Sequence, residues 1–459
     1  MNLTKDFEGK GGMREVFALA VPMIISSACD GVMTFTDRLF LARLGPDQMN
    51  AAMGGAVAAQ ALMFFFIGLT GYSTALVAQY FGAKEKQKTT VAASQAVLVA
   101  VLAWPVIVAA KPLAAQYFQF MHIPASQVGY QTEYLNILVW GSLFSLLRHT
   151  FGCYFSGIGK TTIVMTATVT AMVINVVLDY VLIFGKFGSP ALGVSGAAIA
   201  TVVGSVSACA MLLSAYLGQR NRTEFHVRGS FRFDWQVMKK LVYYGYPAGL
   251  EFFLNLMAFS AMVSLFHAQG PTVATASTIL FNWDFVSFIP LVGIEIGVTS
   301  LVGRYMGAGE PETAERSAVS GIKTGIFYSA AILLLFVLVP ETLVRVFSPS
   351  AFNATFEDAV PLSASMIRIA SLYVLLEAIL VAVVGALRGA GDTHFTMAAS
   401  VAAHWTFVPI LYVSLNVLHL SVLMGWFLLV VFFLSVCTVF IWRFRKGAWK
   451  RISVIDIHS

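Results

Sequence analysis

Carboxylic acids occur inside long apolar stretches of this sequence, where a charged side chain is costly and its presence needs a reason. In the first half these acids are Asp30, Asp37 and Asp179. Asp30 and Asp37 are seven residues apart, which places them on one helical face, two turns from each other. Asn175 and Asp179 are four residues apart and also share a face.

These residues and Thr201 would bring carboxylate, amide and hydroxyl oxygens together. Oxygen ligands suit a proton or a hard cation, so we expect ion coupling at Asp37, Asn175, Asp179 and Thr201, with Na⁺ possible at the first three. Desolvation disfavours the charged form of a carboxylate, so such a group could load and release a proton near neutral pH. The alternative for each acid is a solvated position near a helix end.

The second half carries another set of polar residues within apolar stretches. They are Glu251, Asn255, Asp284, Glu295, Tyr373 and Glu377. Glu251 and Asn255 are one helical turn apart, as are Tyr373 and Glu377, so each pair lines one face. We expect this set, and Asp30, to contact substrate or to form a second ion site. Nearby aromatic rings could stack on a flat organic cation, namely Phe252, Phe253, Trp283 and Tyr373.

The elements that position these residues follow from composition. The chain has 459 residues, of which 58% are hydrophobic and only 11% charged, whereas a soluble domain carries about 25% charged residues. Its apolar surface must therefore face lipid. Apolar runs longer than about 18 residues predict membrane-spanning helices, and alternation typical of a barrel does not recur. We expect twelve spans, near 15–44, 51–80, 91–110, 131–155, 162–185, 192–217, 241–268, 273–303, 318–340, 364–387, 395–415 and 418–442.

An internal repeat relates the two halves. A shift of 225 residues aligns Pro22 with Pro247, Gly45 with Gly270 and Gly68 with Gly293, and a shift of 232 aligns Gly157 to Thr161 with Gly389 to Thr393. Six spans per half give both halves the same orientation, which is a known transporter plan. The prediction is an all-α membrane protein with an N-lobe (1–218), a cytoplasmic linker (219–240), a C-lobe (241–442) and a cytoplasmic tail (443–459).

Basic residues set the expected orientation. We place both termini in the cytoplasm. The cytoplasmic segments, with Arg148 and Arg388 included, then hold most of the 29 Lys and Arg residues. The exceptions are Arg38, Arg43, Lys111, Lys186, Arg345 and Arg368. Basic loops next to anionic lipid account for the pI of about 9.1 without nucleic acid as a partner. We expect a multi-pass protein of the bacterial inner membrane that acts as a monomer. The start of the chain lacks signal-peptide features, so the first span should be retained.

Several other kinds of site are excluded by spacing. The four cysteines lie in apolar stretches without shared spacing, which predicts buried hydrophobic roles. Gly159-Lys160-Thr161 resembles the end of a phosphate-binding loop, but Tyr154 stands where that loop requires glycine. The sequence shows no nucleophile or metal constellation. We therefore expect no enzyme activity and no cofactor other than H⁺ or Na⁺ as a coupling ion.

Four segments resemble the multidrug and toxic compound extrusion (MATE) family over nearly the whole chain. They are Asp37 with Ala42 to Pro46, Asn175 to Gly185, Gly196 to Thr201, and Leu387 to Asp392. The resemblance implies a twelve-helix antiporter of two lobes that expels cationic drugs against entering Na⁺ or H⁺. It also implies that Asp37, Asn175, Asp179 and Thr201 match the family's N-lobe ion site.

The second half departs in part from the sodium-driven branch of that family, which carries acids on the seventh and tenth spans. Glu377 matches the tenth-span position, but the seventh-span position holds Asn255, with Glu251 one turn away. This difference favours ion coupling in the first half. The alternative function is a lipid-linked oligosaccharide flippase of the same superfamily, which needs basic residues for pyrophosphate. Only Arg38, Arg148 and Arg368 could serve that purpose.

Overall fold

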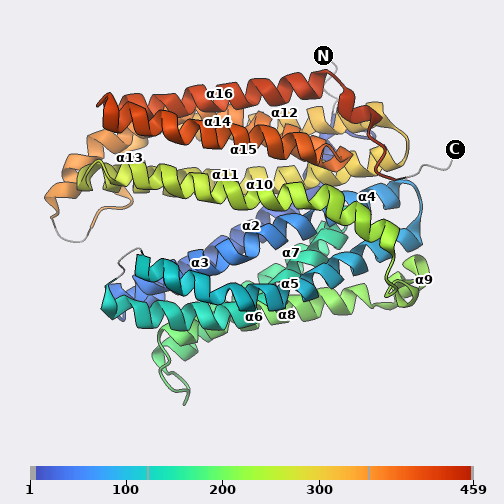
Figure 1. Ribbon diagram of the computed structural model, residues 1–459, viewed down its shortest axis with the longest axis horizontal. Coiled ribbons are helices and arrows are strands. Elements are labelled where there is room, and N and C mark those ends of the chain that lie inside the picture. The colour runs from blue at the N-terminus through green and yellow to red at the C-terminus, as the bar shows by residue number, and fades with distance from the viewer. Residues whose placement is uncertain (1–6, 121–123, 350–351, 456–459) are drawn as a thin grey trace. The chain divides into compact units, whose positions relative to one another are not determined.

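The computed structural model describes residues 7–120, 124–349 and 352–455, and every regular element in these ranges is helical (Figure 1). The main helices of the first half are α2 (Met13–Ala42), α3 (Pro46–Gly71), α4 (Ser73–Gly82), α5 (Lys86–Phe120), α6 (Ala125–Gly157), α7 (Thr161–Phe184) and α8 (Val194–Tyr216). Short helices α9 (Gln219–Phe225) and η1 (Val227–Gly229) follow. The second half contains α10 (Trp235–His267), α11 (Pro271–Gly307), α12 (Pro311–Leu338), α13 (Pro340–Arg345), α14 (Ala354–Ala390), α15 (Thr393–Tyr412), η2 (Val413–Val417), α16 (Val422–Arg445) and η3 (Ala448–Arg451).

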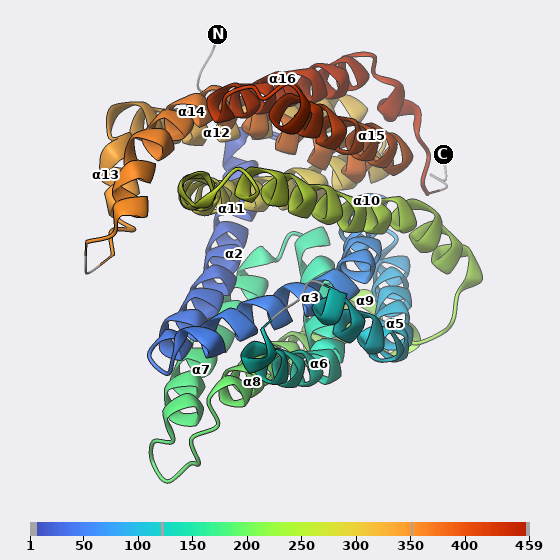
Figure 2. The same ribbon diagram turned by 60° about the vertical axis from the view of Figure 1, so that its left-hand side comes forward.

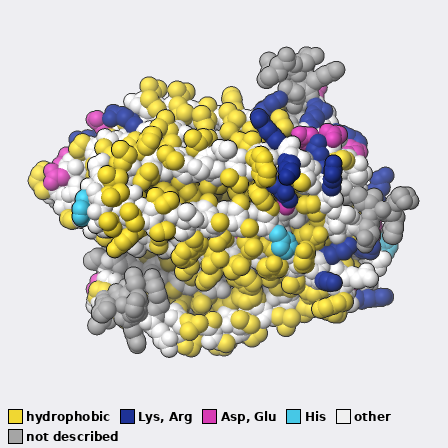
Figure 3. Space-filling model, turned by 45° about the horizontal axis from the view of Figure 1, so that its top comes forward, with side chains coloured by type: hydrophobic (Ala, Val, Ile, Leu, Met, Phe, Trp, Pro, Cys, Tyr) yellow, Lys and Arg dark blue, Asp and Glu magenta, His cyan; other side chains and the backbone are white. Residues whose placement is uncertain are grey.

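Each of the twelve expected spans falls on one helix or on two consecutive helices, which confirms the all-helical membrane fold. Among the described residues, 11 helical stretches are long and apolar enough to cross a bilayer. The remaining expected span is α6, a helix of 33 residues that also carries Glu133 and Arg148. Large apolar side chains such as Phe327 and Leu338 are more than 70% exposed, as lipid-facing residues should be. Figure 3 shows hydrophobic side chains over most of the visible face, with Lys and Arg gathered toward one end.

Helix ends differ from the expected span ends because hydropathy marks the membrane segment and not the helix. The span expected at 364–387 lies within α14, which begins at Ala354 after the side chain of Asn353 caps it by accepting a hydrogen bond from Phe356 N. The span expected at 51–80 is interrupted at Tyr72, between α3 and α4. Helical hydrogen bonding therefore continues beyond the apolar run until a cap or a break stops it.

The chain forms two compact units. The N-terminal unit consists mainly of Val21–Leu250, and the C-terminal unit consists mainly of Glu251–Met306 and Glu310–Ser453 together with the start of the chain up to Ala20. The chain passes between units within α2 and within α10, close to Pro22 and Pro247, the prolines paired by the repeat. The lobe boundaries at 218 and 241 remain predictions.

Small residues allow close helix packing in the N-terminal unit. A side chain at Gly141 of α6 would collide with Val202 of α8, and one at Gly196 of α8 would meet the backbone of Leu182 on α7 at 2.8 Å. Such close approach between helices is how membrane bundles gain packing energy without a hydrophobic driving force. Helices α6, α7 and α8 are therefore in direct contact (Figure 2).

The polar segment after α8 is bound to α5. Thr90 donates a hydrogen bond to the carbonyl of Phe225 at 3.0 Å, and Ser94 donates one to the carbonyl of Ser230 at 2.6 Å. Lys86 also forms an ion pair with Glu224 at 3.3 Å. The predicted linker is thus attached to the N-terminal unit by the first turns of one helix.

The C-terminal unit is built around α14, which packs against α12 and α16 (Figures 1 and 2). Its core includes the buried rings of Phe266, Trp426 and Tyr373. The rings of Phe266 and Trp426 have centroids 4.8 Å apart, and Tyr373 stacks on Phe433 at 4.8 Å. Large aromatic groups thus fill much of the core of this unit.

Candidate functional site

The first set of acids forms one cluster in the N-terminal unit. Asp37 on α2 is 6% exposed, and Asn175 and Asp179 on α7 are fully buried. The Asp37 carboxylate accepts a hydrogen bond from Thr201 of α8 at 3.0 Å and longer contacts from Asn175 at 3.5 Å and from Tyr134 of α6 at 3.4 Å. Four helices therefore contribute polar groups to one buried point.

Local sequence explains why these side chains meet. The four-residue spacing of Asn175 and Asp179 places both on the buried stripe of α7. Gly204, one turn after Thr201 on α8, lies so close to α7 that a side chain there would be 3.2 Å from the carbonyl of Ala171 and 3.4 Å from Asn175. A larger residue at position 204 would move Thr201 away from Asp37.

The two carboxyl groups of this cluster are neighbours. Asp37 and Asp179 are within hydrogen-bonding reach of each other when one of them carries a proton. In the described part of the chain, neither oxygen of Asp179 accepts a hydrogen bond from a fixed donor, and Asn175 Oδ1 is likewise buried without one. Buried carboxylates this close can both stay ionised only if a metal cation lies between them, and otherwise one of them binds a proton.

Asp30 lies outside that cluster. Its carboxylate accepts a hydrogen bond from Arg148 of α6 at 2.9 Å, and the two side chains are 44% and 24% exposed. Thr34, which shares the face of Asp30, donates a hydrogen bond to the backbone carbonyl of that residue. The Asp30–Arg148 pair is thus a separate, partly exposed ion pair in the N-terminal unit.

Asp284, Tyr373 and Glu377 come together in the C-terminal unit. The Tyr373 hydroxyl donates a hydrogen bond to Asp284 of α11 at 3.2 Å, and Glu377, one turn further along α14, interacts electrostatically with Asp284. Glu377 is 4% exposed, and its Oε2 is without a hydrogen-bond partner in the residues described. This second pair of carboxyl groups could hold an ion or the charged part of a substrate.

Glu251 and Glu295 share a single guanidinium. Arg388, in the last turn of α14, contacts Glu251 of α10 at 3.1 Å and Glu295 of α11 at 2.5 Å. Asn255 is not part of this triad, because its amide donates to Ser400 of α15 at 2.9 Å. The seventh-span candidates therefore separate into an ion pair and a neutral hydrogen bond.

The aromatic residues considered for cation stacking contact the protein itself. Phe252 lies beneath the guanidinium of Arg388 at 5.2 Å, and Tyr373 stacks on Phe433. Trp283 donates to the carbonyl of Leu343 and meets Phe347 edge-on. In this conformation a flat cation would have to displace Arg388 or Phe433 to reach the Phe252 or Tyr373 face used in these contacts.

Sequence reasoning missed the roles of three residues. Tyr134 was not selected, although it lies 14 residues before Arg148, nearly four helical turns, and thus on the same face of α6. Arg148 and Arg388 are counted with the cytoplasmic segments, and their side of the membrane stays a prediction, but their ion-pair partners are not predicted from the sequence. Arg148 lies within α6 beside Asp30, and Arg388 is a helical residue between two glutamates. Counting basic residues assigns them to loops because it cannot detect a carboxylate on a neighbouring helix.

A tightly held transition metal needs a group of several His, Cys, Asp or Glu ligands, unlike a coupling ion that binds and leaves. In residues 7–120, 124–349 and 352–455, no three His, Cys, Asp or Glu side chains are grouped to hold a metal ion. The four cysteines are buried and unpaired.

Comparison with known proteins agrees with the repeat and the fold. The MatE family model matches residues 22–181 and 247–413, segments whose starts and ends differ by the 225- and 232-residue shifts found in the sequence. The probable multidrug resistance protein NorM of Thermotoga maritima is 25% identical over 448 residues, which cover 96% of this chain and 94% of that protein. The multidrug resistance protein PmpM of Pseudomonas aeruginosa is 27% identical over 412 residues, 88% of this chain and 84% of that protein.

Solved structures show the same fold. A transporter of the MOP superfamily from Pyrococcus furiosus, reported with a reversed polarity of its binding pocket, has a TM-score of 0.87 at 18% identity and covers 98% of this chain and 99% of its own. An outward-facing multidrug resistance MATE family transporter has a TM-score of 0.86 at 19% identity, with coverage of 98% and 99%. The family model matches most of the chain in both halves, and the chain therefore belongs to the MatE family, the multidrug and toxic compound extrusion proteins.

Proposed function

We propose that this chain is a secondary transporter that exports small organic compounds, including cationic ones, in exchange for entering H⁺ or Na⁺. The observation that carries the proposal is the buried Asp37–Asp179 pair, surrounded by neutral hydrogen-bonding groups from α6, α7 and α8. The names of the relatives, multidrug resistance proteins NorM and PmpM, support an organic substrate. The membrane fold and the two compact units suit alternating access.

The coupling step follows from the electrostatics of the cluster. When the site is open to the outside, a proton or Na⁺ binds between Asp37 and Asp179 and neutralises one negative charge. Asn175 Oδ1 and the Asp179 oxygens are available as ligands, because fixed donors do not occupy them in the described structure. Ion binding then favours the conformation in which α2, α6, α7 and α8 pack closely, and bound substrate is released. An ion shifts this equilibrium only by its difference in affinity for the two states.

We further propose that the transporter acts as a monomer in the bacterial inner membrane with both termini in the cytoplasm. The basic residues at the end of α16 and in the segment after α8 support this orientation, because cytoplasmic loops are enriched in Lys and Arg.

The flippase alternative has less support. Of the arginines that could bind a pyrophosphate, Arg148 is paired with Asp30 at 2.9 Å, and Arg368 lies 3.9 Å from Glu341. Arg38 alone would remain from that set, whereas a diphosphate needs several cationic groups. Organic-cation export therefore fits the charge distribution better.

The test is efflux of a fluorescent organic cation in membrane vesicles, with Na⁺ and pH gradients imposed separately. The proposal expects one of the two gradients to drive transport in the wild type and neither to drive it in the Asp37→Asn variant. Asp358→Asn is the matched control, because Asp358 is an exposed acid at the start of α14. Normal efflux by Asp37→Asn at equal expression would overturn the site assignment, and transport independent of both gradients would overturn ion exchange.

A further inference from the structure

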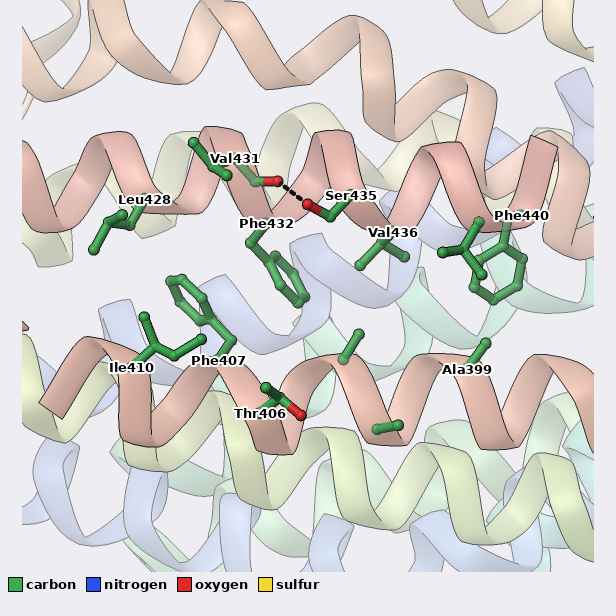
Figure 4. Close-up of a pocket in the computed structure, with 13 residues that line it drawn as sticks. Ala399, Thr406, Phe407, Ile410, Leu428, Val431, Phe432, Ser435, Val436 and Phe440 are labelled. Atoms are coloured by element: carbon green, nitrogen blue, oxygen red, sulfur yellow. Dashed lines mark hydrogen bonds between the residues drawn. The ribbon is translucent and has the colours of Figure 1, made fainter. Parts of the chain in front are cut away.

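An apolar groove runs between α15 and α16 of the C-terminal unit (Figure 4). Its volume of about 500 Å³ is within the range of small-molecule sites. Phe407, Val436 and Phe440 line it and are buried. Val431 and Val439 also line it, but are 45% and 44% exposed. The groove therefore has a buried floor and an exposed rim.

Small residues on α15 produce the groove. Ala399, Ala402 and Ala403 are spaced three and four residues apart, so they lie on one face and leave space opposite the larger residues of α16. The hydroxyl of Ser435 donates to the carbonyl of Val431 in its own helix at 2.7 Å and is thus already engaged (Figure 4). The lining consists mostly of hydrocarbon and favours an apolar chain.

The length of the groove matches one leaflet of a bilayer. Along α16 it extends from Leu428 to Phe440, which is about 18 Å at 1.5 Å per residue. Half of a hydrocarbon core of about 30 Å is roughly 15 Å. Both helices belong to stretches long and apolar enough to span a membrane, so the groove is at the depth of lipid tails.

Cationic side chains follow directly after the groove. The Arg443 guanidinium lies over Phe395 at 4.8 Å, and the Phe395 ring meets Phe440 of the groove floor at 5.8 Å. Arg443 uses Nε and Nη2 for two hydrogen bonds to Asp392, so three of its five N–H donors are not used in that pair. Arg445 and Lys446 follow Arg443 closely in the chain, at the end of α16, and are exposed. An anionic head group would therefore find donors and positive charge at this end.

We propose that the groove binds one acyl chain of an anionic phospholipid, whose phosphate lies against Arg443, Arg445 and Lys446. The apolar groove suits the acyl chain of such a lipid, and the basic end suits its phosphate. The proposal concerns the C-terminal unit alone and does not depend on which compound is transported or which ion drives transport.

The test is native mass spectrometry of the full-length protein, delipidated and then mixed with equal amounts of palmitoyl-oleoyl phosphatidylglycerol and palmitoyl-oleoyl phosphatidylcholine. We expect one phosphatidylglycerol to be retained per chain. Ala403→Phe fills the groove and should remove this lipid. Ala398→Phe is the matched control, because Ala398 is exposed on the same helix and does not line the groove, and it should retain the lipid.

A second variant tests the head group without altering the groove. Arg445→Gln with Lys446→Gln should lower the preference for phosphatidylglycerol over phosphatidylcholine by roughly fivefold per charge removed, or about 25-fold in total. Unchanged retention in Ala403→Phe, or equal retention of both lipids by the wild type, would overturn the proposal. The proposal would also be overturned if a transported dye such as ethidium displaced the lipid and if Ala403→Phe then failed to bind the dye. The groove would in that case be a substrate site.

Discussion

Two clusters of buried carboxylates, one from each unit, obtain their positive charge differently. In the N-terminal unit Asp37 and Asp179 face each other among neutral groups, Tyr134, Asn175 and Thr201. In the C-terminal unit Glu251 and Glu295 lie on either side of Arg388, which neutralises one of their charges. A pair of the first kind must obtain its cation from solution, whereas a pair of the second kind contains its own. We propose ion exchange at the N-terminal pair and a packing role for the Glu–Arg–Glu triad.

The largest change in stability is expected from replacing Arg388, the cation of the triad. Arg388→Met leaves Glu251 and Glu295 buried without a positive partner and should lower the free energy of unfolding by about 3–5 kcal/mol. Thermal unfolding of the purified protein in detergent measures this change. Adding Glu251→Gln and Glu295→Gln to Arg388→Met should recover most of the stability. If Arg388→Met unfolds at the wild-type temperature, the triad does not stabilise the fold.

Replacing one acid of the Asp37–Asp179 pair should change the free energy of unfolding in the opposite direction, toward greater stability. Asp179→Asn removes a buried charge whose oxygens lack fixed donors in the described residues, so it should raise the free energy of unfolding by about 1–3 kcal/mol without the coupling ion. The variant should also lose the upward shift in unfolding temperature that the coupling ion gives the wild type. A destabilised Asp179→Asn that still responds to Na⁺ or to acid would remove the distinction between the two units.

A smaller effect is expected from Tyr134. Its hydroxyl makes one long hydrogen bond to Asp37, at 3.4 Å. Tyr134→Phe should therefore cost about 1 kcal/mol of stability and leave efflux detectable. Tyr180→Phe is the control, because Tyr180 is on α7 but 44% exposed. Complete loss of efflux in Tyr134→Phe would mean that this phenol takes part in ion binding and does not merely support Asp37.

The smallest stability effect should come from the partly exposed pair in the N-terminal unit. Arg148→Met breaks its contact with Asp30, and solvent screening limits the loss to about 1 kcal/mol or less. The same unfolding assay measures it next to Arg388→Met. A loss as large as that of Arg388→Met would show that the Asp30–Arg148 pair is as strongly buried as the triad.

Much of the fold could be predicted from the sequence, because glycine and proline positions and apolar run lengths reflect the lipid environment directly. The 225-residue shift that pairs Pro22 with Pro247 recurs in the two matches of the family model. Helix ends were less predictable, since α14 starts at a cap formed by Asn353, ten residues before the apolar run.

The site was predictable where partners share a helix or a familiar motif. The four-residue spacing of Asn175 and Asp179 gave their common face, as did that of Tyr373 and Glu377. Contacts between side chains on different helices could not be predicted from residue spacing. The pairing of Arg388 with Glu251 joins residues 137 positions apart, and spacing carries no signal over that separation. Tyr134 was missed for the same reason, since only the structure brings α6 to Asp37.

Direct ion binding by the purified protein tests the central claim most closely. Proton uptake is measured by acid titration with and without Na⁺, for the wild type and for the Asp37→Asn, Asp179→Asn double variant. Near neutral pH, we expect the wild type to hold one more cation than the double variant, either a proton or a Na⁺ that competes with it. Equal uptake by both proteins would contradict the assignment of ion exchange to the Asp37–Asp179 pair.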